Sequence, residues 1–180
     1  MENLKMSNVF QEYHYKDSDT VNSPVIPKNL KRGVVDYSDI VKENKGKTSV
    51  NNKKVIDMDR IKDSLHITPT PSSMDVVFVG ERNNKDKFYF LIDFKFDVSS
   101  PREVCNNINN EDIRKKYSFT KAYIQEKDID IRVYDTAFFV FKNKDFEIVK
   151  NSWMKRNLNS PKNAAVKQCD FEIVFEQNEK

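Results

Sequence analysis

The stretch Met74–Phe96, MDVVFVGERNNKDKFYFLIDFKF, carries the clearest structural pattern in the sequence. Its two ends, Asp75–Val79 and Phe88–Phe96, are rich in β-branched and aromatic residues. Between them, Glu81–Lys87 contains no large apolar residue. This pattern predicts two β-strands joined by a polar turn, that is, a hairpin around which the rest of the chain is arranged.

Each predicted strand carries an acid at the same end of this hairpin. The first strand opens on Asp75 and the second ends on Asp93-Phe94-Lys95, so antiparallel pairing brings the two acids together. Because side chains alternate along a strand, Asp93 and Lys95 stand side by side on the face opposite Phe94. Burying such charges is costly unless each has a partner, and a divalent ion with a bound water would supply partners.

Asp93 and Lys95 also have a simpler interpretation, as a surface ion pair on an edge strand. The tripeptide itself is weak evidence for a site, since an acid two residues before a lysine recurs at Glu43-Asn44-Lys45. The context of the hairpin is the stronger argument, because it places a second acid beside the first.

The composition indicates a single globular domain. The chain has 180 residues, 38% of them hydrophobic, which is enough to bury a real core. Its net charge of +3 is only mildly basic and does not by itself indicate nucleic-acid binding. We expect a helical or irregular N-terminal segment over residues 1–50 and the main core over residues 51–180.

The two cysteines, Cys105 and Cys169, lack the spacing of a zinc or redox motif. We expect them to be buried small hydrophobic residues in a reducing compartment. The N-terminus has no apolar run of signal-peptide length, and no stretch of eighteen consecutive apolar residues occurs. These features predict a cytoplasmic protein without a membrane partner.

Flanking segments carry weaker signals. A short apolar piece surrounds Val9 and Phe10, and a proline-containing loop follows over residues 18–27. Residues 36–45 suit a short helix that ends at Gly46 in a left-handed conformation. Residues 55–65 mix helical and irregular spacing.

After the hairpin, Ser100-Pro101 with Glu103 predicts a helix start, and the four asparagines of residues 106–110 predict a break.

A second helix is predicted from Glu111 to about Gln125. Its apolar face comprises Ile113, Tyr117, Thr120, Ala122, Tyr123 and Ile124. Its opposite face is basic and carries Arg114, Lys115, Lys116 and Lys121. Either simple solvation or contact with phosphates accounts for this basic run, so the four residues are candidates for substrate binding.

The C-terminal part returns to strand character. Residues 129–142 predict a buried strand, and residues 146–149 a hairpin partner for it. Residues 152–158 predict a helix that packs Trp153 on the sheet, and residues 169–175 a final strand or short helix. The resulting fold class is α/β (α+β), with a central mixed β-sheet flanked by helices.

Asp75, followed by Asp93-x-Lys95 on the next predicted strand, a helix and a further apolar strand, resembles the pattern of the PD-(D/E)xK nuclease superfamily. Within it, the chain looks most like the cap-snatching endonuclease at the N-terminus of bunyavirus polymerase (L) proteins. The resemblance covers about residues 66–142 and rests on four pieces: His66-Ile67-Thr68-Pro69, LIDFKF at 91–96, Val98-Ser99-Ser100 and Arg114-Lys115-Lys116-Tyr117.

The resemblance implies a divalent metal site that holds Mn²⁺ or Mg²⁺, as one or two ions. Its ligands would be Asp75, Asp93, the carbonyl of Phe94 and an upstream histidine, for which His14 is the candidate. Further acids are open among Glu43, Asp57 and Asp59. Lys95 would assist the attacking water, and the helix lysine that holds the phosphate would be Lys116 or, failing that, Lys115.

The function implied is metal-dependent endonucleolytic cleavage, with single-stranded RNA as the first substrate and the remainder of a viral polymerase as a partner. Two alternatives remain. One is a nuclease-like fold that no longer cuts and works as a binding or antitoxin-like module, in which Asp93 and Lys95 merely pair. The other is a bacterial or phage DNA nuclease with the same site.

Overall fold

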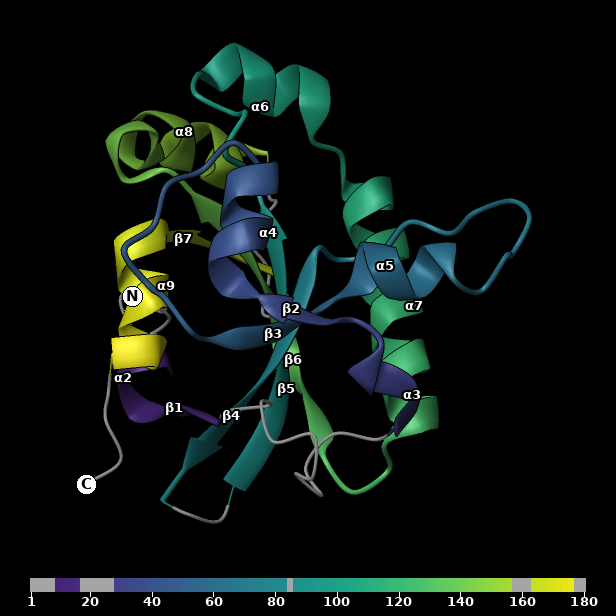
Figure 1. Ribbon diagram of the computed structural model, residues 1–180. Helices are drawn as coiled ribbons and strands as arrows, with labels where there is room; N and C mark the ends of the chain where they lie inside the picture. Colours follow the sequence, from purple (N-terminus) through teal and green to yellow (C-terminus); the bar gives the residue numbers. More distant parts are fainter. Residues whose placement is uncertain (1–8, 17–27, 84–85, 157–162, 177–180) are drawn as a thin grey trace.

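The computed structural model describes residues 9–16, 28–83, 86–156 and 163–176 (Figure 1). Within these residues, seven strands form one mixed β-sheet with helices on both faces. The fold is therefore α+β, as the sequence pattern predicts.

The sheet is an antiparallel half joined to a parallel half. The strands are β1 (His14–Lys16), β2 (Val34–Asp36), β3 (Lys54–Asp57), β4 (Val76–Arg82), β5 (Asp86–Phe94), β6 (Arg132–Phe141) and β7 (Asn163–Lys167). Their order is β2-β3-β4-β5-β6-β7, with β1 also paired to β4. All pairs up to β4–β5 are antiparallel, whereas β6 runs parallel to both β5 and β7.

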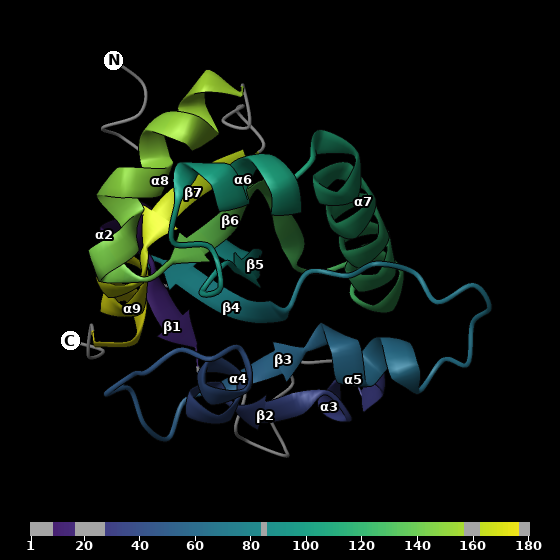
Figure 2. The same ribbon diagram turned by 90° about the horizontal axis from the view of Figure 1, so that it is seen from above.

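Helices cover both faces of the sheet. They are α2 (Val9–Glu12), α3 (Lys28–Lys31), α4 (Tyr37–Glu43), α5 (Met58–Asp63), α6 (Pro101–Asn107), α7 (Asn110–Lys127), α8 (Asn143–Lys155) and α9 (Gln168–Glu176). Figure 1 shows α4 and α9 to the left of the strands and α5 and α7 to the right. Figure 2 shows the segment between α5 and β4 looping outward from the body of the protein.

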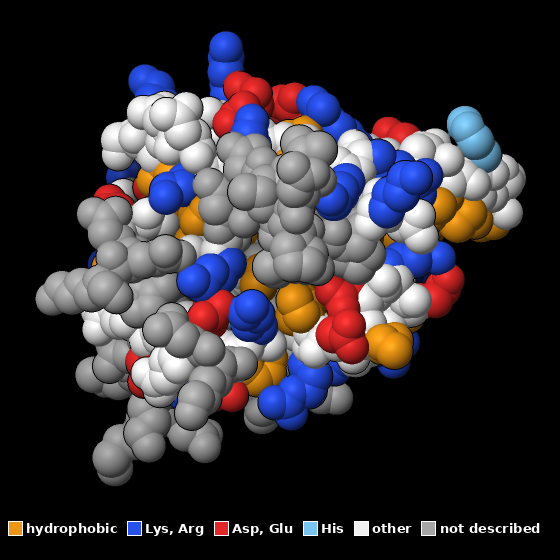
Figure 3. Space-filling view, turned by 60° about the horizontal axis from the view of Figure 1, so that its bottom comes forward, with side chains coloured by type: hydrophobic (Ala, Val, Ile, Leu, Met, Phe, Trp, Pro, Cys, Tyr) orange, Lys and Arg blue, Asp and Glu red, His pale blue; other side chains and the backbone are white. Residues whose placement is uncertain are grey.

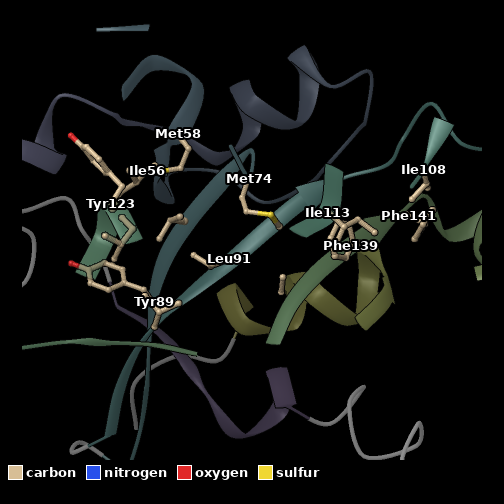
Figure 4. Close-up of a cluster of buried hydrophobic side chains, with 14 of the residues drawn as sticks. Ile56, Met58, Met74, Tyr89, Leu91, Ile108, Ile113, Tyr123, Phe139 and Phe141 are labelled. Carbon is tan, nitrogen blue, oxygen red and sulfur yellow. The ribbon is translucent and has the colours of Figure 1, made fainter. Parts of the chain in front are cut away.

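Two hydrophobic cores fill the space between the sheet and these helices. One core joins Leu91 and Phe139 of the sheet to side chains of α3, α5, α6, α7 and α8. Met74, Leu91, Ile113 and Phe139 lie together in it (Figure 4). The other core, rich in phenylalanine, joins alternate residues of the same strands to α2, α4 and α9. The alternation predicted along β5 is therefore confirmed, because Leu91 and Ile92 enter different cores.

The predicted hairpin is present as β4 and β5, which pair antiparallel from Val76↔Ile92 to Arg82↔Asp86. Its strands extend further into the predicted turn than the composition suggests. Glu81 lies within β4 and is buried, because Lys16 and Lys87 both form ion pairs with its carboxylate. The second strand ends at Phe94 rather than at Phe96.

Strands that precede residue 50 belong to this same sheet. β1 pairs with β4, and β2 pairs with β3, so the sheet crosses the boundary drawn at residue 50. Phe10 of α2 is fully buried against Phe138 and Phe171. Residues 55–65, whose spacing is mixed, divide into β3 and α5. The proline-containing loop at residues 18–27 lies outside the described residues.

The C-terminal part differs from the sequence prediction in two places, residues 146–149 and β7. Residues 146–149 are not a strand; they lie within α8, which also contains Trp153. Trp153 is buried against Phe139 and Phe141, so the predicted packing of Trp153 on the sheet is confirmed. Residues 169–175 are helical, within α9, so the helix is confirmed over the strand that was its alternative. β7 is a strand that the sequence pattern did not predict.

The expected burial of the cysteines is wrong. Cys105 lies on α6 and Cys169 in the first turn of α9, and both are exposed. Each helix directs its larger apolar side chains, such as Val104 and Phe171, into the cores and leaves the cysteine outside. Among the described residues, no helix combines the length and the apolar character that a membrane span requires.

The end of α4 shows why Gly46 is a glycine, and the reason differs from the one predicted. The left-handed residue is Lys45, at φ 61°, while the N–H groups of Lys45 and Gly46 donate to the carbonyls of Lys42 and Val41. This is a Schellman ending with lysine in the position that usually holds glycine. A Cβ on Gly46 would lie 2.4 Å from the ring of Phe96.

We therefore expect Gly46→Ala to lower the free energy of unfolding by about 1–3 kcal/mol, because the added methyl overpacks the contact with Phe96. Urea denaturation measures this loss. Ser49→Ala, at an exposed position in the same loop, is the matched control and should change stability little. Equal stability of Gly46→Ala and Ser49→Ala would contradict the close packing at Gly46.

A candidate site where β4, β5 and α7 meet

The two predicted acids meet at the end of the hairpin. Asp75 directly precedes β4, and its N–H donates to the carbonyl of Ile92 at 3.0 Å, so it continues the pairing with β5. Its carboxylate turns back and accepts the N–H of Phe94 at 2.7 Å. Asp93 lies at the end of β5, an inner strand, and its side chain is 1% exposed. The edge-strand interpretation of Asp93 is therefore wrong.

Two lysines converge on Asp93 from different elements. Lys95 Nζ donates to Asp93 Oδ1 at 2.6 Å, and Lys116 Nζ of α7 donates to Asp93 Oδ2 at 2.8 Å. Lys116 Nζ is also 3.8 Å from Asp75 Oδ1. The four charged groups form one compact cluster, in which the side chains of Lys95 and Lys116 are 16% and 25% exposed.

A buried hydrogen bond helps to fix the position of α7 relative to the two acids. The Met74 N–H donates to Thr120 Oγ1 at 2.9 Å, and Thr120 is fully buried. Lys116 stands one helical turn before Thr120, on the same side of α7. The bond therefore places Lys116 beside Asp75, the residue that follows Met74. In the sequence Thr120 stands within the predicted apolar face of this helix, and its hydroxyl, a polar group in that face, is the signal of this contact.

The pKa values of the two acids shift in opposite directions within the cluster. Burial and the negative charge of Asp93 raise the pKa of Asp75 to about 8, although Lys116 and Lys95 oppose that shift. Burial also acts against ionisation of Asp93, but the adjoining ammonium groups of Lys95 and Lys116 outweigh it, so the pKa of Asp93 is lowered. For Lys116, the charges of both acids outweigh burial and raise its pKa. Asp93 is the permanent anion of the site.

The raised pKa of Asp75 predicts a pH-dependent stability. A carboxyl whose pKa is higher in the folded state stabilises the fold fully below its unfolded pKa of about 4, and this contribution is lost as pH rises through about 8. Asp75→Asn cannot lose a proton, so we expect the variant to gain stability relative to wild type between pH 5 and pH 9. Urea denaturation across that range measures the difference, and parallel profiles would contradict it.

The other basic residues of α7 do not join the cluster. Lys115 is exposed and pairs with Glu111 at 2.7 Å. Lys121 Nζ donates to Tyr117 and to Asp135 on β6, and Arg114 is exposed. The structure therefore separates Lys116 from Lys115 as the lysine facing the acids. On the face in Figure 3, Lys and Arg side chains are interspersed with acidic ones rather than gathered into one basic surface.

His14 is not brought to the acids. In the pairing of β1 with β4 its backbone lies opposite Glu81, six residues along β4 from Asp75. Six residues of a strand span about 20 Å. The expectation that His14 joins this site as a metal ligand therefore conflicts with the register of β1, which places His14 at the opposite end of β4.

The three further acids have separate positions. Asp57 is buried and caps α5, accepting the N–H of Arg60 at 3.0 Å. Glu43 is exposed at the end of α4, which packs on the other face of the sheet. Asp59 acts on the cluster through its charge: it accepts a hydrogen bond from Ser73 at 2.9 Å, and its negative charge is among the causes that raise the pKa of Lys116.

The donor set suits a hard divalent ion but is small. Asp75 and Asp93 both lie within ion-pair distance of the one ammonium of Lys116, so their carboxylates face a common point. Carboxylate oxygens are the ligands that Mg²⁺ and Mn²⁺ prefer. Among the described residues, no three His, Cys, Asp or Glu side chains gather where they could hold a metal. A metal here would rest on two acids, with backbone and water oxygens completing its shell.

Comparison of the chain with protein-family models, with curated proteins and with solved structures found no match. The class of protein defined by the structure is thus an α+β fold with a buried acid and lysine cluster at the end of its central hairpin.

Proposed function

We propose that this chain is a divalent-metal-dependent endonuclease that hydrolyses phosphodiester bonds. The observation that carries the proposal is the convergence of Asp75, Asp93, Lys95 and Lys116 from two strands and a helix at one buried point. A structural ion pair needs one acid and one lysine. Two of each, with one acid's pKa raised to about 8, is the kind of perturbed cluster that marks a functional site.

The chemistry follows from charge. The carboxylates of Asp75 and Asp93, with the carbonyl of Phe94, would hold Mn²⁺ or Mg²⁺. When bound, such an ion neutralises phosphate charge and lowers the pKa of a bound water. Lys95, as an ammonium, would position the attacking water and stabilise the charge that develops on the phosphate. Lys116 would hold the scissile phosphate.

Single-stranded RNA is the substrate proposed first, and the resemblance to cap-snatching endonucleases of viral polymerases supports it. In that case the remainder of a polymerase would be the partner. RNA and DNA are not distinguished by the described residues, because an exposed cation of α7 such as Arg114 suits any phosphate backbone.

One observation favours a second candidate, a nuclease-like fold that binds a partner without cutting. Both oxygens of Asp93 are already engaged by lysines, so the cluster is neutralised without a metal. In that reading the four residues serve to hold α7 on the hairpin.

Labelled RNA and DNA strands of one sequence, incubated with the wild-type chain and Mn²⁺, Mg²⁺ or EDTA, test the proposal. We expect cleavage of single-stranded RNA with Mn²⁺ and none with EDTA. Cleavage of DNA alone would favour the bacterial or phage type of nuclease. A folded protein that cuts neither, and whose melting temperature Mn²⁺ leaves unchanged, would contradict the proposal and favour the binding module.

A further inference from the structure

The ammonium of Lys116 occupies the space between the two acids. It lies 2.8 Å from Asp93 Oδ2 and 3.8 Å from Asp75 Oδ1, while Lys95 engages the remaining oxygen of Asp93. A cation held jointly by Asp75 and Asp93 would have to lie close to both of these oxygens. Lys116 therefore stands where such an ion would bind.

We infer that Lys116 is a built-in counter-ion of this site, and that a divalent ion enters only by displacing its ammonium from between Asp75 and Asp93. The inference rests on the proposed function, since it concerns the metal that this function requires. In this structure, the Lys116 ammonium therefore occupies the cation position of the site, and a metal ion has to displace it.

The charges explain why one lysine must leave. With both acids ionised, Lys95 and Lys116 already balance them, and adding a dication to the same four groups would leave a net charge of about +2 in a mostly buried place. Moving one ammonium into solvent lowers that excess and frees carboxylate oxygens for the metal.

Lys116 is the lysine better able to move. Lys95 lies two residues from Asp93 on the same face, so its backbone keeps it beside the acid. Lys116 reaches the acids from α7, and its side chain is the more exposed of the two, at 25% against 16%. Its flexible four-carbon stem allows the ammonium to turn toward solvent while the helix stays in place. From there it would meet an incoming phosphate.

Calorimetric titration with Mn²⁺ tests this inference without any measurement of cleavage. We expect Lys116→Met to bind Mn²⁺ about tenfold more tightly than wild type, because the competing charge is gone. Lys115→Met, the neighbour that pairs with Glu111 in solvent, should bind within about twofold of wild type. Equal or weaker binding by Lys116→Met would overturn the inference and leave the proposed function standing. If none of the three proteins bound Mn²⁺, both the inference about Lys116 and the proposed function would be contradicted.

A second measurement uses the wild-type chain and so does not depend on how Lys116→Met folds. The side-chain ammonium signals of lysine are followed by ¹⁵N NMR as diamagnetic Mg²⁺ is added. We expect the Lys116 signal to shift and its protons to exchange faster with water, while the Lys115 signal stays in place. A Lys116 signal that does not move at saturating Mg²⁺ would contradict displacement. A protein that binds neither Mg²⁺ nor, in the calorimetric titration, Mn²⁺ would contradict the proposed function too.

Discussion

Asp93→Asn is expected to lower the rate of Mn²⁺-dependent cleavage at least about a hundredfold, the scale for losing an electrostatic group of an active site. Asp93 is the acid that stays ionised, because Lys95 and Lys116 hold its pKa down despite complete burial. An amide of the same shape keeps the side chain in place but removes the charge that orients Lys95 and that, in the proposed function, would hold a metal. Cleavage of labelled RNA over time gives the rate.

The control for this loss is Asp135→Asn. Asp135 also pairs with a lysine of α7, Lys121, but its side chain is 89% exposed and lies outside the cluster. We expect this variant to cut at the wild-type rate. If Asp93→Asn, shown to be folded by circular dichroism, cut as fast as Asp135→Asn, Asp93 would not be part of the active site.

Asp93→Ala should have the largest effect on stability, lowering the free energy of unfolding by about 3 kcal/mol. The substitution leaves two lysines facing each other in a mostly buried place without their shared carboxylate. Their partial exposure lets the ammonium groups turn outward, which limits the loss. Urea denaturation at pH 7 measures it, and Asp135→Ala, which breaks only a surface pair, should cost less than about 1 kcal/mol.

A double-mutant cycle separates repulsion between the lysines from general damage to the fold. In a Lys116→Met background only one ammonium remains at the site, so we expect Asp93→Ala to cost clearly less there than in wild type. The same cost in both backgrounds would show that Lys116 and Asp93 do not interact, contrary to their 2.8 Å contact.

Much of the hairpin could be predicted from the sequence because its signals are local. Alternation of Leu91, Ile92 and Asp93 assigns the faces of β5 without knowledge of other strands, and the Ser100-Pro101 cap starts α6 as expected, with Ser100 accepting the N–H of Glu103. Asp75 and Asp93 come close together in any antiparallel hairpin formed by these two strands, so their proximity also follows from the sequence.

The elements that the sequence analysis missed depend on longer patterns or on packing. In residues 146–149 the apolar letters look like a strand, but Phe146, Val149 and Trp153 recur with helical spacing and are the buried residues of α8, whereas Ile148 is exposed. β7 is short and contains one β-branched residue, Val166, so little in its letters predicts a strand. Its pairing with β6 decides its conformation.

Among the candidate site residues, too, the positions that could not be predicted depend on contacts between distant segments. Four basic residues of α7 are candidates by sequence, and the contact of Thr120 with the Met74 N–H, together with the buried apolar face of α7, places Lys116 toward the acids. His14 is the sole histidine of residues 1–50, and a sequence does not reveal that β1 pairs with the far end of β4. Contacts between distant segments set both positions.

The comparison of Lys116→Ala with Lys115→Ala in Mn²⁺-dependent RNA cleavage tests whether the buried acid and lysine cluster is the active site. These neighbours have the same charge and lie on the same helix, yet Lys116 contacts Asp93 at 2.8 Å while Lys115 pairs with Glu111 in solvent. We expect Lys116→Ala to lose cleavage and Lys115→Ala to keep it. Equal activity of the two variants, or loss only in Lys115→Ala, would contradict a site built from Asp75, Asp93, Lys95 and Lys116.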